Sequence, residues 1–343
     1  MNLLIGLLLA TLGGGIQGAF VYPQKFMKNW KWENGWFIFT ITCCMIFPVI
    51  LAFATNSGLI ELYKQIDSST LWYVFLAGIG WGIGVVLFGL GVEYMGMALG
   101  IAIITALNAT IGTVLPIFFL PNGIFTPLSL IILSIGLVML IIGVIVISMA
   151  GKQREKDQTQ TEVPEQRSKV SFKVGLIVCI VAAIFCPSTI FAVHFSKPIA
   201  EAAMASGLVS SINVGWSQLF LWYIGGFIVN SIYCIYLFNK NKSLGKFKSS
   251  GKLKNTLLGV SMSAFFLIGM VLLTVATEIF LGKTGAIIAW PLFLAATIMC
   301  ANILGLMSGE WKGVSRKATN QLYAGIALLI VAIIIVSSSN QFN

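Results

Sequence analysis

The sequence predicts an all-α integral membrane protein in which ten transmembrane helices form two inverted five-helix repeats. Three observations predict it. First, 58% of the 343 residues are apolar and only 9% are charged. Second, the apolar residues occur in segments of about 20, the length at which a helix crosses a bilayer. Third, the lysines and arginines are concentrated in alternate connections between those segments.

The apolar segments leave little sequence between them. They lie at residues 3–22, 35–55, 71–92, 97–118, 127–149, 174–195, 209–238, 255–278, 284–307 and 320–338. The first has no positive residue before it and is followed by nine more, which favours a retained span over a removable signal peptide. Because no connection is long enough to fold alone, we expect the activity to lie within the membrane.

The distribution of positive charge predicts the orientation. With ten spans, all but three of the 21 lysines and arginines lie on one side of the membrane. The exceptions are Lys64, Lys197 and Lys283. Because cytoplasmic loops collect Lys and Arg, we expect both termini to lie outside a bacterial inner membrane. The net charge of +10 then reports topology, and the lysine-rich residues 239–254 indicate contact with anionic lipid rather than with nucleic acid.

A polar stretch divides the chain into two halves. Residues 151–173 are predicted to be a cytoplasmic linker between a first five-helix repeat at 1–150 and a second at 174–343. An odd number of spans in each half makes the second half enter the membrane from the opposite side, as in the inverted repeats of many secondary transporters.

Weakened helices point to a binding site. Gly13-Gly14-Gly15 and Gly18 are predicted to interrupt the first helix, and Pro187 the sixth. Glycine and proline interruptions at matching places in two halves are typical of a transport site, although glycine also allows close helix packing. We expect the packing role for the glycines of the third and fourth helices, which are Gly78, Gly80, Gly82, Gly84, Gly89, Gly91, Gly96 and Gly100.

The polar residues of the spans are mainly amides and tryptophans. An amide offers a donor and an acceptor to hydroxyl groups, and an aromatic face packs against the C–H face of a sugar ring, so these residues favour a neutral, polyhydroxylated solute. We expect the solute near the membrane midplane, between the two halves. The expected binding residues are Gln17, Trp81, Asn108, Pro187 and Trp290. Taken singly, each amide is also compatible with an interhelical hydrogen bond.

Coupling to an ion gradient requires a group that gains and loses a proton, or a sodium site. The candidates are Glu93, Glu278, Lys25 and His194, which is the only histidine. Each is also compatible with a solvated or anchoring role, because each is predicted at the end of a helix. The six cysteines have no metal-ligand spacing, so we expect neither a metal nor a cofactor.

Several motifs resemble those of one transporter family. The run Gln17-Gly18-Ala19-Phe20-Val21-Tyr22-Pro23 with Lys25, and Trp30-Lys31-Trp32-Glu33-Asn34 with Trp36, resemble the start of the L-rhamnose–proton symporter family. Gly80-Trp81-Gly82, Gly96-Met97-Ala98-Leu99-Gly100 and Gly309-Glu310-Trp311-Lys312-Gly313 also resemble it, in the same order. The resemblance runs along the whole chain. It implies the ten-helix inverted fold of the drug/metabolite transporter superfamily.

Together these features predict a secondary transporter that imports a sugar, L-rhamnose or a related deoxyhexose, with protons by alternating access. The expected partners are the sugar, protons and membrane lipid. The alternatives are a facilitator or exporter of another small metabolite and, less favoured, a membrane-embedded enzyme. An enzyme requires a carboxylate pair, a metal cluster or a nucleophile with its base, and the sequence offers no such set.

Overall fold

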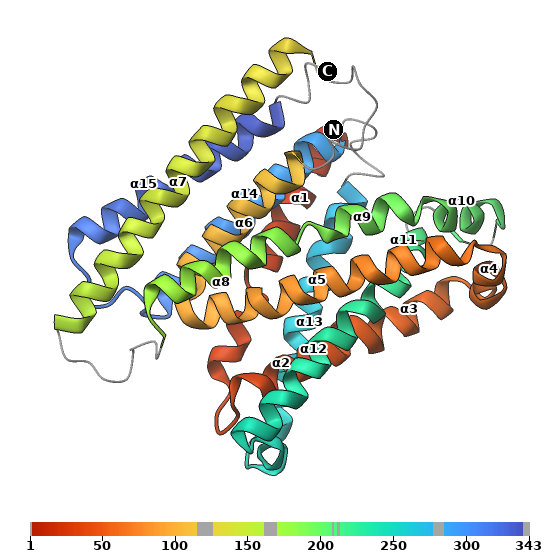
Figure 1. Ribbon diagram of the computed structural model, residues 1–343, viewed down its shortest axis with the longest axis horizontal. Coiled ribbons are helices and arrows are strands. Elements are labelled where there is room, and N and C mark those ends of the chain that lie inside the picture. Colours follow the sequence, from red (N-terminus) through yellow and green to blue (C-terminus); the bar gives the residue numbers. More distant parts are fainter. Residues whose placement is uncertain are drawn as a thin grey trace. The chain divides into compact units, whose positions relative to one another are not determined.

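The computed structural model of the protein describes residues 2–114, 126–160, 170–207, 209–210, 213–276 and 285–338. Every regular element within these ranges is helical (Figure 1). Contacts between residues group the chain into two compact units. Unit 1 comprises residues 1–19, 87–184 and 268–343, and unit 2 comprises residues 20–86 and 185–267.

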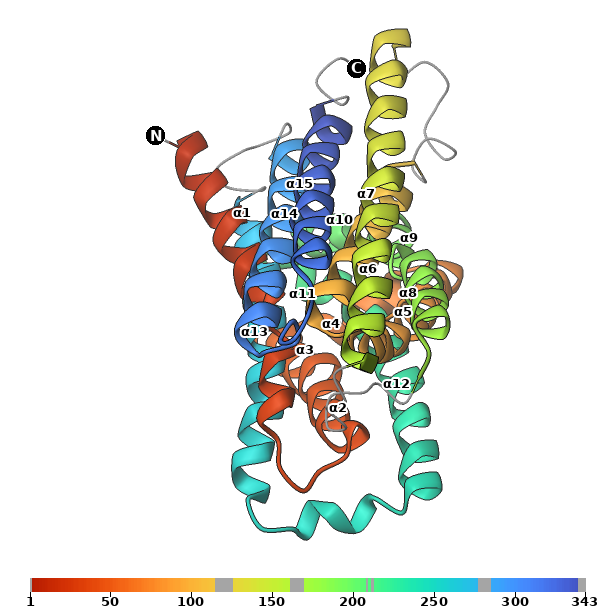
Figure 2. The same cartoon turned by 90° about the vertical axis from the view of Figure 1, so that its left-hand side faces the viewer.

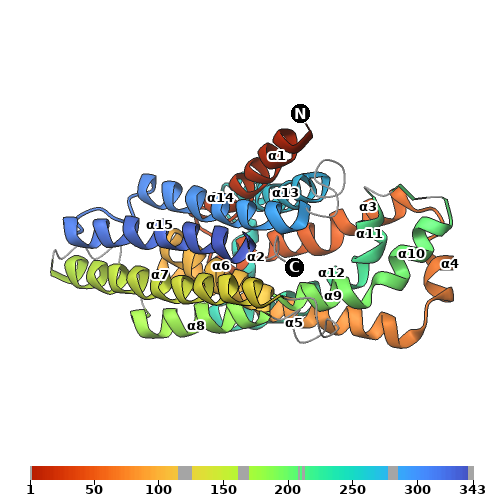
Figure 3. The same cartoon turned by 90° about the horizontal axis from the view of Figure 1, so that it is seen from above.

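Unit 1 is built from long apolar helices. Its elements are α1 (Asn2–Gly18), the end of α5 (Ser68–Met95), α6 (Met97–Val114), α7 (Pro127–Gln160), α8 (Phe172–Phe185), the end of α13 (Lys252–Val275), α14 (Gly285–Met307) and α15 (Arg316–Ser338). Helices α7 and α15 run side by side (Figure 3), and α14 packs against α1, α6 and α15.

Unit 2 contains shorter and more interrupted helices. They are η1 (Tyr22–Phe26), α2 (Trp32–Ile41), the π-helical η2 (Thr42–Ile46), α3 (Phe47–Thr55), α4 (Leu59–Gln65), the start of α5, α9 (Ser188–Phe195), α10 (Lys197–Ala205), α11 (Val214–Gln218), α12 (Phe220–Asn241), η5 (Leu244–Lys248) and the start of α13. Helix α2 packs against α12, and Figure 2 shows the connection from α12 to α13 that contains η5.

The protein is a multi-pass membrane protein by the length and composition of its helices. Six helical segments are long and apolar enough to cross a membrane: Leu4–Phe26, Trp32–Thr55, Ser68–Met95, Pro127–Gln158, Phe220–Asn241 and Lys252–Val275. Three shorter apolar helices lie at Met97–Ala109, Phe172–Phe185 and Leu292–Met307. Each of the ten predicted segments overlaps at least one helix, while the number of crossings stays a prediction.

Two predicted boundaries differ from the structure. Helix α7 continues to Gln160, so residues 151–160 of the predicted linker are helical. The reason is that Arg154 and Gln158 on this extension bond to other parts of unit 1. The predicted span 209–238 is not one helix, because α11 ends at Gln218 and α12 begins at Phe220.

Gly13-Gly14-Gly15 do not interrupt α1, which corrects that part of the prediction, whereas Gly18 is the residue at which α1 ends. The helix is regular through Gly13-Gly14-Gly15 and ends at Gly18. A Cβ atom at Gly14 would lie 2.1 Å from the carbonyl oxygen of Phe293, and one at Gly18 would lie 2.6 Å from that of Thr297. The hydroxyl of Thr297 donates to the carbonyl oxygen of Gly14 at 3.0 Å. These glycines therefore bring α1 and α14 into backbone contact.

Candidate functional site

Two interrupted helices pack against the same stretch of α5 in unit 2. The first interruption is at Pro187, which is buried and stands between the end of α8 and the start of α9. A Cβ atom at Gly84 would lie 2.7 Å from the backbone nitrogen of Cys186, and one at Gly80 would lie 2.8 Å from the hydroxyl oxygen of Ser188. The predicted interruption at Pro187 is confirmed. Helix α5 can approach it closely because glycines, which have no side chain, stand at the contact.

The second interruption is between α11 and α12, at Leu219. The first residues of α12 lie against α5, since a Cβ atom at Gly78 would be 2.3 Å from the carbonyl oxygen of Trp222. The contact is mutual, because a Cβ atom at Gly225 would be 2.5 Å from the carbonyl oxygen of Phe75. The packing role predicted for Gly78 is thus confirmed. Discontinuous helices are a common construction of transport sites.

Trp81 lies on this stretch of α5 within a cluster of aromatic rings. Its ring centroid is 4.1 Å from that of Trp222, 6.3 Å from that of Tyr223 and 6.2 Å from that of Phe266. Trp81 is 5% exposed and Trp222 is 2% exposed. A Cβ atom at Gly226 would lie 2.6 Å from the Trp81 ring, so the ring fits only because glycine stands there. Trp81 and the Pro187 interruption are therefore on neighbouring elements.

Three further predicted residues belong to unit 1, on helices that touch one another. Gln17 lies on α1, Asn108 on α6 and Trp290 on α14, and α14 packs against both other helices. Gln17 and Asn108 are half-buried, and within the described residues neither side-chain amide has a hydrogen-bond partner. The Trp290 side chain lies outside the described part. Both amides therefore keep donors and acceptors for a solute.

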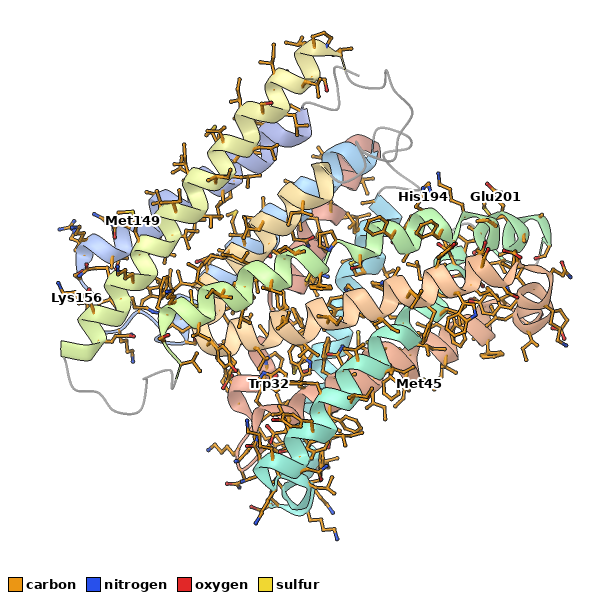
Figure 4. The ribbon with its side chains drawn as sticks, in the orientation of Figure 1. Trp32, Met45, Met149, Lys156, His194 and Glu201 are labelled. Atoms are coloured by element: carbon orange, nitrogen blue, oxygen red, sulfur yellow. The ribbon has the colours of Figure 1, made fainter. Side chains whose placement is uncertain are left out.

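The predicted coupling residues that the structure describes are exposed. Glu93 is exposed near the end of α5, and Lys25 is exposed in η1. His194 is exposed near the end of α9 (Figure 4), beside the ring of Phe195 at 5.4 Å between centroids. Glu278 lies outside the described residues. Of the described candidates, none is buried in a span.

A carboxylate that the sequence prediction left out organises one end of unit 1. Glu310 accepts hydrogen bonds from the backbone nitrogens of Met97 at 2.9 Å and Ala98 at 3.3 Å, the first residues of α6. Its charge is favourable there, because unpaired N–H groups and the helix dipole make a helix N-terminus positive. The preceding turn needs Gly96, which has φ of +82° and therefore terminates α5 rather than serving only as a packing residue.

Arg154 completes this arrangement. Its guanidinium donates to the carbonyl oxygen of Met95 at 2.8 Å and lies over the Trp311 ring, 5.3 Å from its centroid. Gln158 donates to the carbonyl oxygen of Glu310 at 3.0 Å. In the sequence, the Gly309–Gly313 motif was the feature that pointed to Glu310. Arg154 entered the sequence analysis only as one of the positive charges that predict the topology.

A second carboxylate outside the predicted site, Glu33, is buried and joins two helices of unit 2. Glu33 is 2% exposed at the start of α2, and its Oε1 accepts hydrogen bonds from the side chains of Asn241 and Ser243. Asn34 donates to the carbonyl oxygen of Ser243 at 3.0 Å. These bonds join the start of α2 to the end of α12. Among the described residues, no cluster of three or more His, Cys, Asp or Glu is placed to hold a metal ion.

Comparison with known proteins identifies relatives over nearly the whole chain. The L-rhamnose-proton symporter of Pectobacterium atrosepticum is 28% identical over 345 residues, which cover 96% of both chains. That of Yersinia pestis bv. Antiqua is 29% identical over 346 residues, again 96% of both chains. That of Citrobacter koseri is 28% identical over 341 residues, 96% of this chain and 95% of the relative. No solved structure matches.

The family assignment rests on a separate comparison. The sequence profile described as L-rhamnose-proton symport protein (RhaT) matches residues 1–340. Its match covers the interrupted helices, the Trp81 cluster and the Glu310 turn. The resemblance seen in the motifs is thereby confirmed at the level of the family. This chain belongs to the L-rhamnose-proton symport protein family.

Proposed function

We propose that the protein is a secondary active transporter that imports a sugar, L-rhamnose or a related deoxyhexose, in symport with protons. The observation that carries this proposal is the family match along residues 1–340. Relatives that align over 96% of the chain are named L-rhamnose-proton symporters. A symporter is a transporter and not an enzyme. The interrupted helices around Trp81 support the same function, because alternating access is commonly built on discontinuous helices.

The proposal includes the architecture predicted from the sequence. Ten spans would form two inverted repeats, residues 1–150 and 174–343, as in the drug/metabolite transporter superfamily. Both termini would lie outside a bacterial inner membrane, since the positive residues fall in connections on one side. Because the two repeats have the same fold in opposite orientations, movement of one against the other can open the binding site to each side of the membrane in turn.

We assign sugar binding to Gln17, Trp81, Asn108, Pro187 and Trp290. The unpartnered amides of Gln17 and Asn108 support this assignment, because an amide donates to and accepts from hydroxyl groups. The tryptophans would cover the apolar face of the sugar, and the interruption at Pro187 would free backbone carbonyl groups. Replacing Gln17 or Asn108 with Ala would weaken sugar binding by about 1 kcal/mol.

Reconstitution into liposomes tests the proposal. The purified chain is sealed into vesicles that contain a pH-sensitive dye, and L-rhamnose, other deoxyhexoses and common hexoses are added in turn outside. A proton symporter acidifies the vesicle interior when its sugar is added, and it accumulates that sugar against its gradient when an inward proton gradient is imposed. Sugar equilibration without accumulation would instead identify a facilitator, and no response to any sugar would refute sugar transport.

A further inference from the structure

One buried polar group in the Trp81 cluster has no partner. The indole nitrogen of Trp222 is buried, and within the described residues it has no hydrogen-bond acceptor. Its nearest aromatic neighbour is Trp81, with centroids 4.1 Å apart and planes tilted by 37°. An aromatic ring is a much weaker acceptor than a hydroxyl oxygen. A buried N–H group without an acceptor costs about 1–3 kcal/mol, so such a group calls for an explanation.

A second buried tryptophan in unit 2 shows the ordinary arrangement. Trp36 is 1% exposed, and its indole nitrogen donates to Oδ1 of Asn230 at 3.0 Å. Asn230 in turn donates to the carbonyl oxygens of Gly82 and Gly226. This unit thus satisfies the N–H group of one tryptophan on α2 through a side chain of α12. The N–H group of Trp222, on α12 itself, is buried beside Trp81 without an acceptor within the described residues.

Trp30 and Trp311 also have indole nitrogens without acceptors, but their positions differ. Both lie in connections between helices, and Trp311 is covered by the cation of Arg154. Trp222 lies instead in the third position of α12, a helix long and apolar enough to span the membrane. Because the Trp222 side chain is only 2% exposed, bulk water does not reach its indole nitrogen, and a protein or ligand oxygen must satisfy the N–H group.

The surroundings of Trp222 fit a neutral ring with hydroxyl groups. Residues 68–92 of α5 and 220–238 of α12 contain no Asp, Glu, Lys or Arg, so nothing on these two segments selects an ion. Trp81 stands near the middle of the 28-residue α5, at the depth where transport sites are found. An aromatic face beside a free N–H donor matches a sugar, which has an apolar C–H face and hydroxyl oxygens at its edge.

We infer that Trp222 is a specificity-determining residue that donates its indole N–H to one hydroxyl oxygen of the transported sugar while the ring lies against Trp81. The inference rests on the proposed function, since it requires a sugar as the solute. It adds a residue outside the predicted site and assigns it one hydrogen bond. The bond distinguishes sugars by whether they carry an oxygen at one position, because losing that oxygen leaves the N–H group unsatisfied.

The test compares Trp222→Phe with Trp36→Phe in reconstituted vesicles. Phenylalanine keeps an aromatic ring and removes the N–H group in both variants. For Trp222→Phe we expect KM for L-rhamnose uptake to rise about 3- to 10-fold, the effect of one hydrogen bond. For Trp36→Phe we expect an unchanged KM and a lower unfolding temperature, because Asn230 loses the donor to its Oδ1. Thermal unfolding of both variants in detergent gives their unfolding temperatures and shows that each is folded at the temperature of the uptake assay.

Monodeoxy analogues of L-rhamnose identify the hydroxyl. In the wild-type protein, removal of one particular hydroxyl should raise KM by the same factor as Trp222→Phe. In Trp222→Phe, removal of that hydroxyl should have no further effect, because the two changes delete the same bond. A merely structural tryptophan would lower affinity for every analogue equally.

The outcomes separate the two proposals. If the wild-type protein takes up L-rhamnose and Trp222→Phe leaves KM and the analogue pattern unchanged, the inference is wrong while the proposed function stands. If all analogues lose affinity alike in Trp222→Phe, the inference is also wrong, and Trp222 is a packing residue. If the wild-type protein neither binds nor transports any sugar of the panel, both proposals fail.

Discussion

Single charged residues of this protein act at helix ends. Glu310 bonds to the first residues of α6, Arg154 bonds to the last residue of α5, and Glu33 joins α2 to the residues after α12. The two glutamates accept from backbone or side-chain donors, and Arg154 donates to a backbone carbonyl oxygen, so each satisfies a group that would otherwise be unpaired in or near the membrane. Glu93 differs from these residues because its side chain is exposed. Of the two glutamates that the sequence indicated for proton coupling, it is the one within the described part of the chain.

Replacing Glu93 with Gln tests proton coupling directly. Glutamine keeps the shape of the side chain and cannot release a proton. If Glu93 carries the coupled proton, the variant will exchange sugar across vesicle membranes but will no longer accumulate it in response to a proton gradient. Accumulation equal to that of the wild type would assign Glu93 to the helix end and make Glu278 the next residue to replace.

Replacing Glu310 with Ala should destabilise the protein by about 1–2 kcal/mol, because the backbone nitrogens of the buried Met97 and Ala98 lose their acceptor. The denaturant midpoint in detergent micelles, followed with a thiol-reactive dye that detects the buried cysteines, measures this loss. The matched control is Glu201→Ala on α10, an exposed carboxylate (Figure 4), for which we expect a change below about 0.5 kcal/mol. Equal midpoints for the two variants would contradict the capping role of Glu310.

At the scale of elements, glycine decides where helices touch. On α5, Gly78 faces α12, whereas Gly80 and Gly84 face the interruption at Pro187. On α1, Gly14 and Gly18 face α14. In the absence of a hydrophobic driving force within lipid, such close approach supplies the van der Waals contact that holds spanning helices together. Helix interruption therefore comes from Pro187 and from the α11–α12 junction, and not from Gly13-Gly14-Gly15 of α1.

Two adjacent glycines of α1 provide a test of this packing. A Cβ atom at Gly14 would lie 2.1 Å from a carbonyl oxygen of α14, whereas one at Gly15 would meet nothing within 4 Å. Gly14→Ala should separate α1 from α14 and lower the free energy of unfolding, obtained from the denaturant midpoint in detergent, by about 1–3 kcal/mol. Gly15→Ala should leave stability unchanged or raise it by up to about 1 kcal/mol, because alanine is the better helix former. A similar loss in both variants would point to a requirement for flexibility instead.

At the scale of the whole molecule, each compact unit draws on both halves of the sequence. Unit 1 includes residues 1–19 and 87–150 from the first half and 174–184 and 268–343 from the second, and unit 2 likewise takes residues 20–86 and 185–267. The chain passes from one unit to the other between residues 19 and 20, 86 and 87, 184 and 185, and 267 and 268. The proposed sequence repeats and the compact units are thus different divisions of the chain.

Reporter fusions test the proposed topology. An alkaline phosphatase fused after Asn343 should be active, because that enzyme folds in the oxidising periplasm, and one inserted after Gln160 should be inactive. A fluorescent protein that folds only in the cytoplasm should give the opposite pattern at both sites. Activity of the phosphatase after Gln160, or its inactivity after Asn343, would contradict the ten-span arrangement with both termini outside.

The sequence by itself determined the helical membrane class, the family and the interruption at Pro187. These follow from local properties: runs of apolar residues, motifs in order, and a residue that lacks a backbone donor. It did not determine the role of the glycines of α1, because a glycine is equally compatible with a hinge and with a contact until its neighbour is known. Only the tertiary structure placed Phe293 against Gly14, Glu310 against the start of α6, and Trp222 beside Trp81 with no acceptor for its N–H group. Each of these pairs is more than 100 residues apart in the chain, and a contact at that separation depends on the packing of whole helices rather than on local sequence.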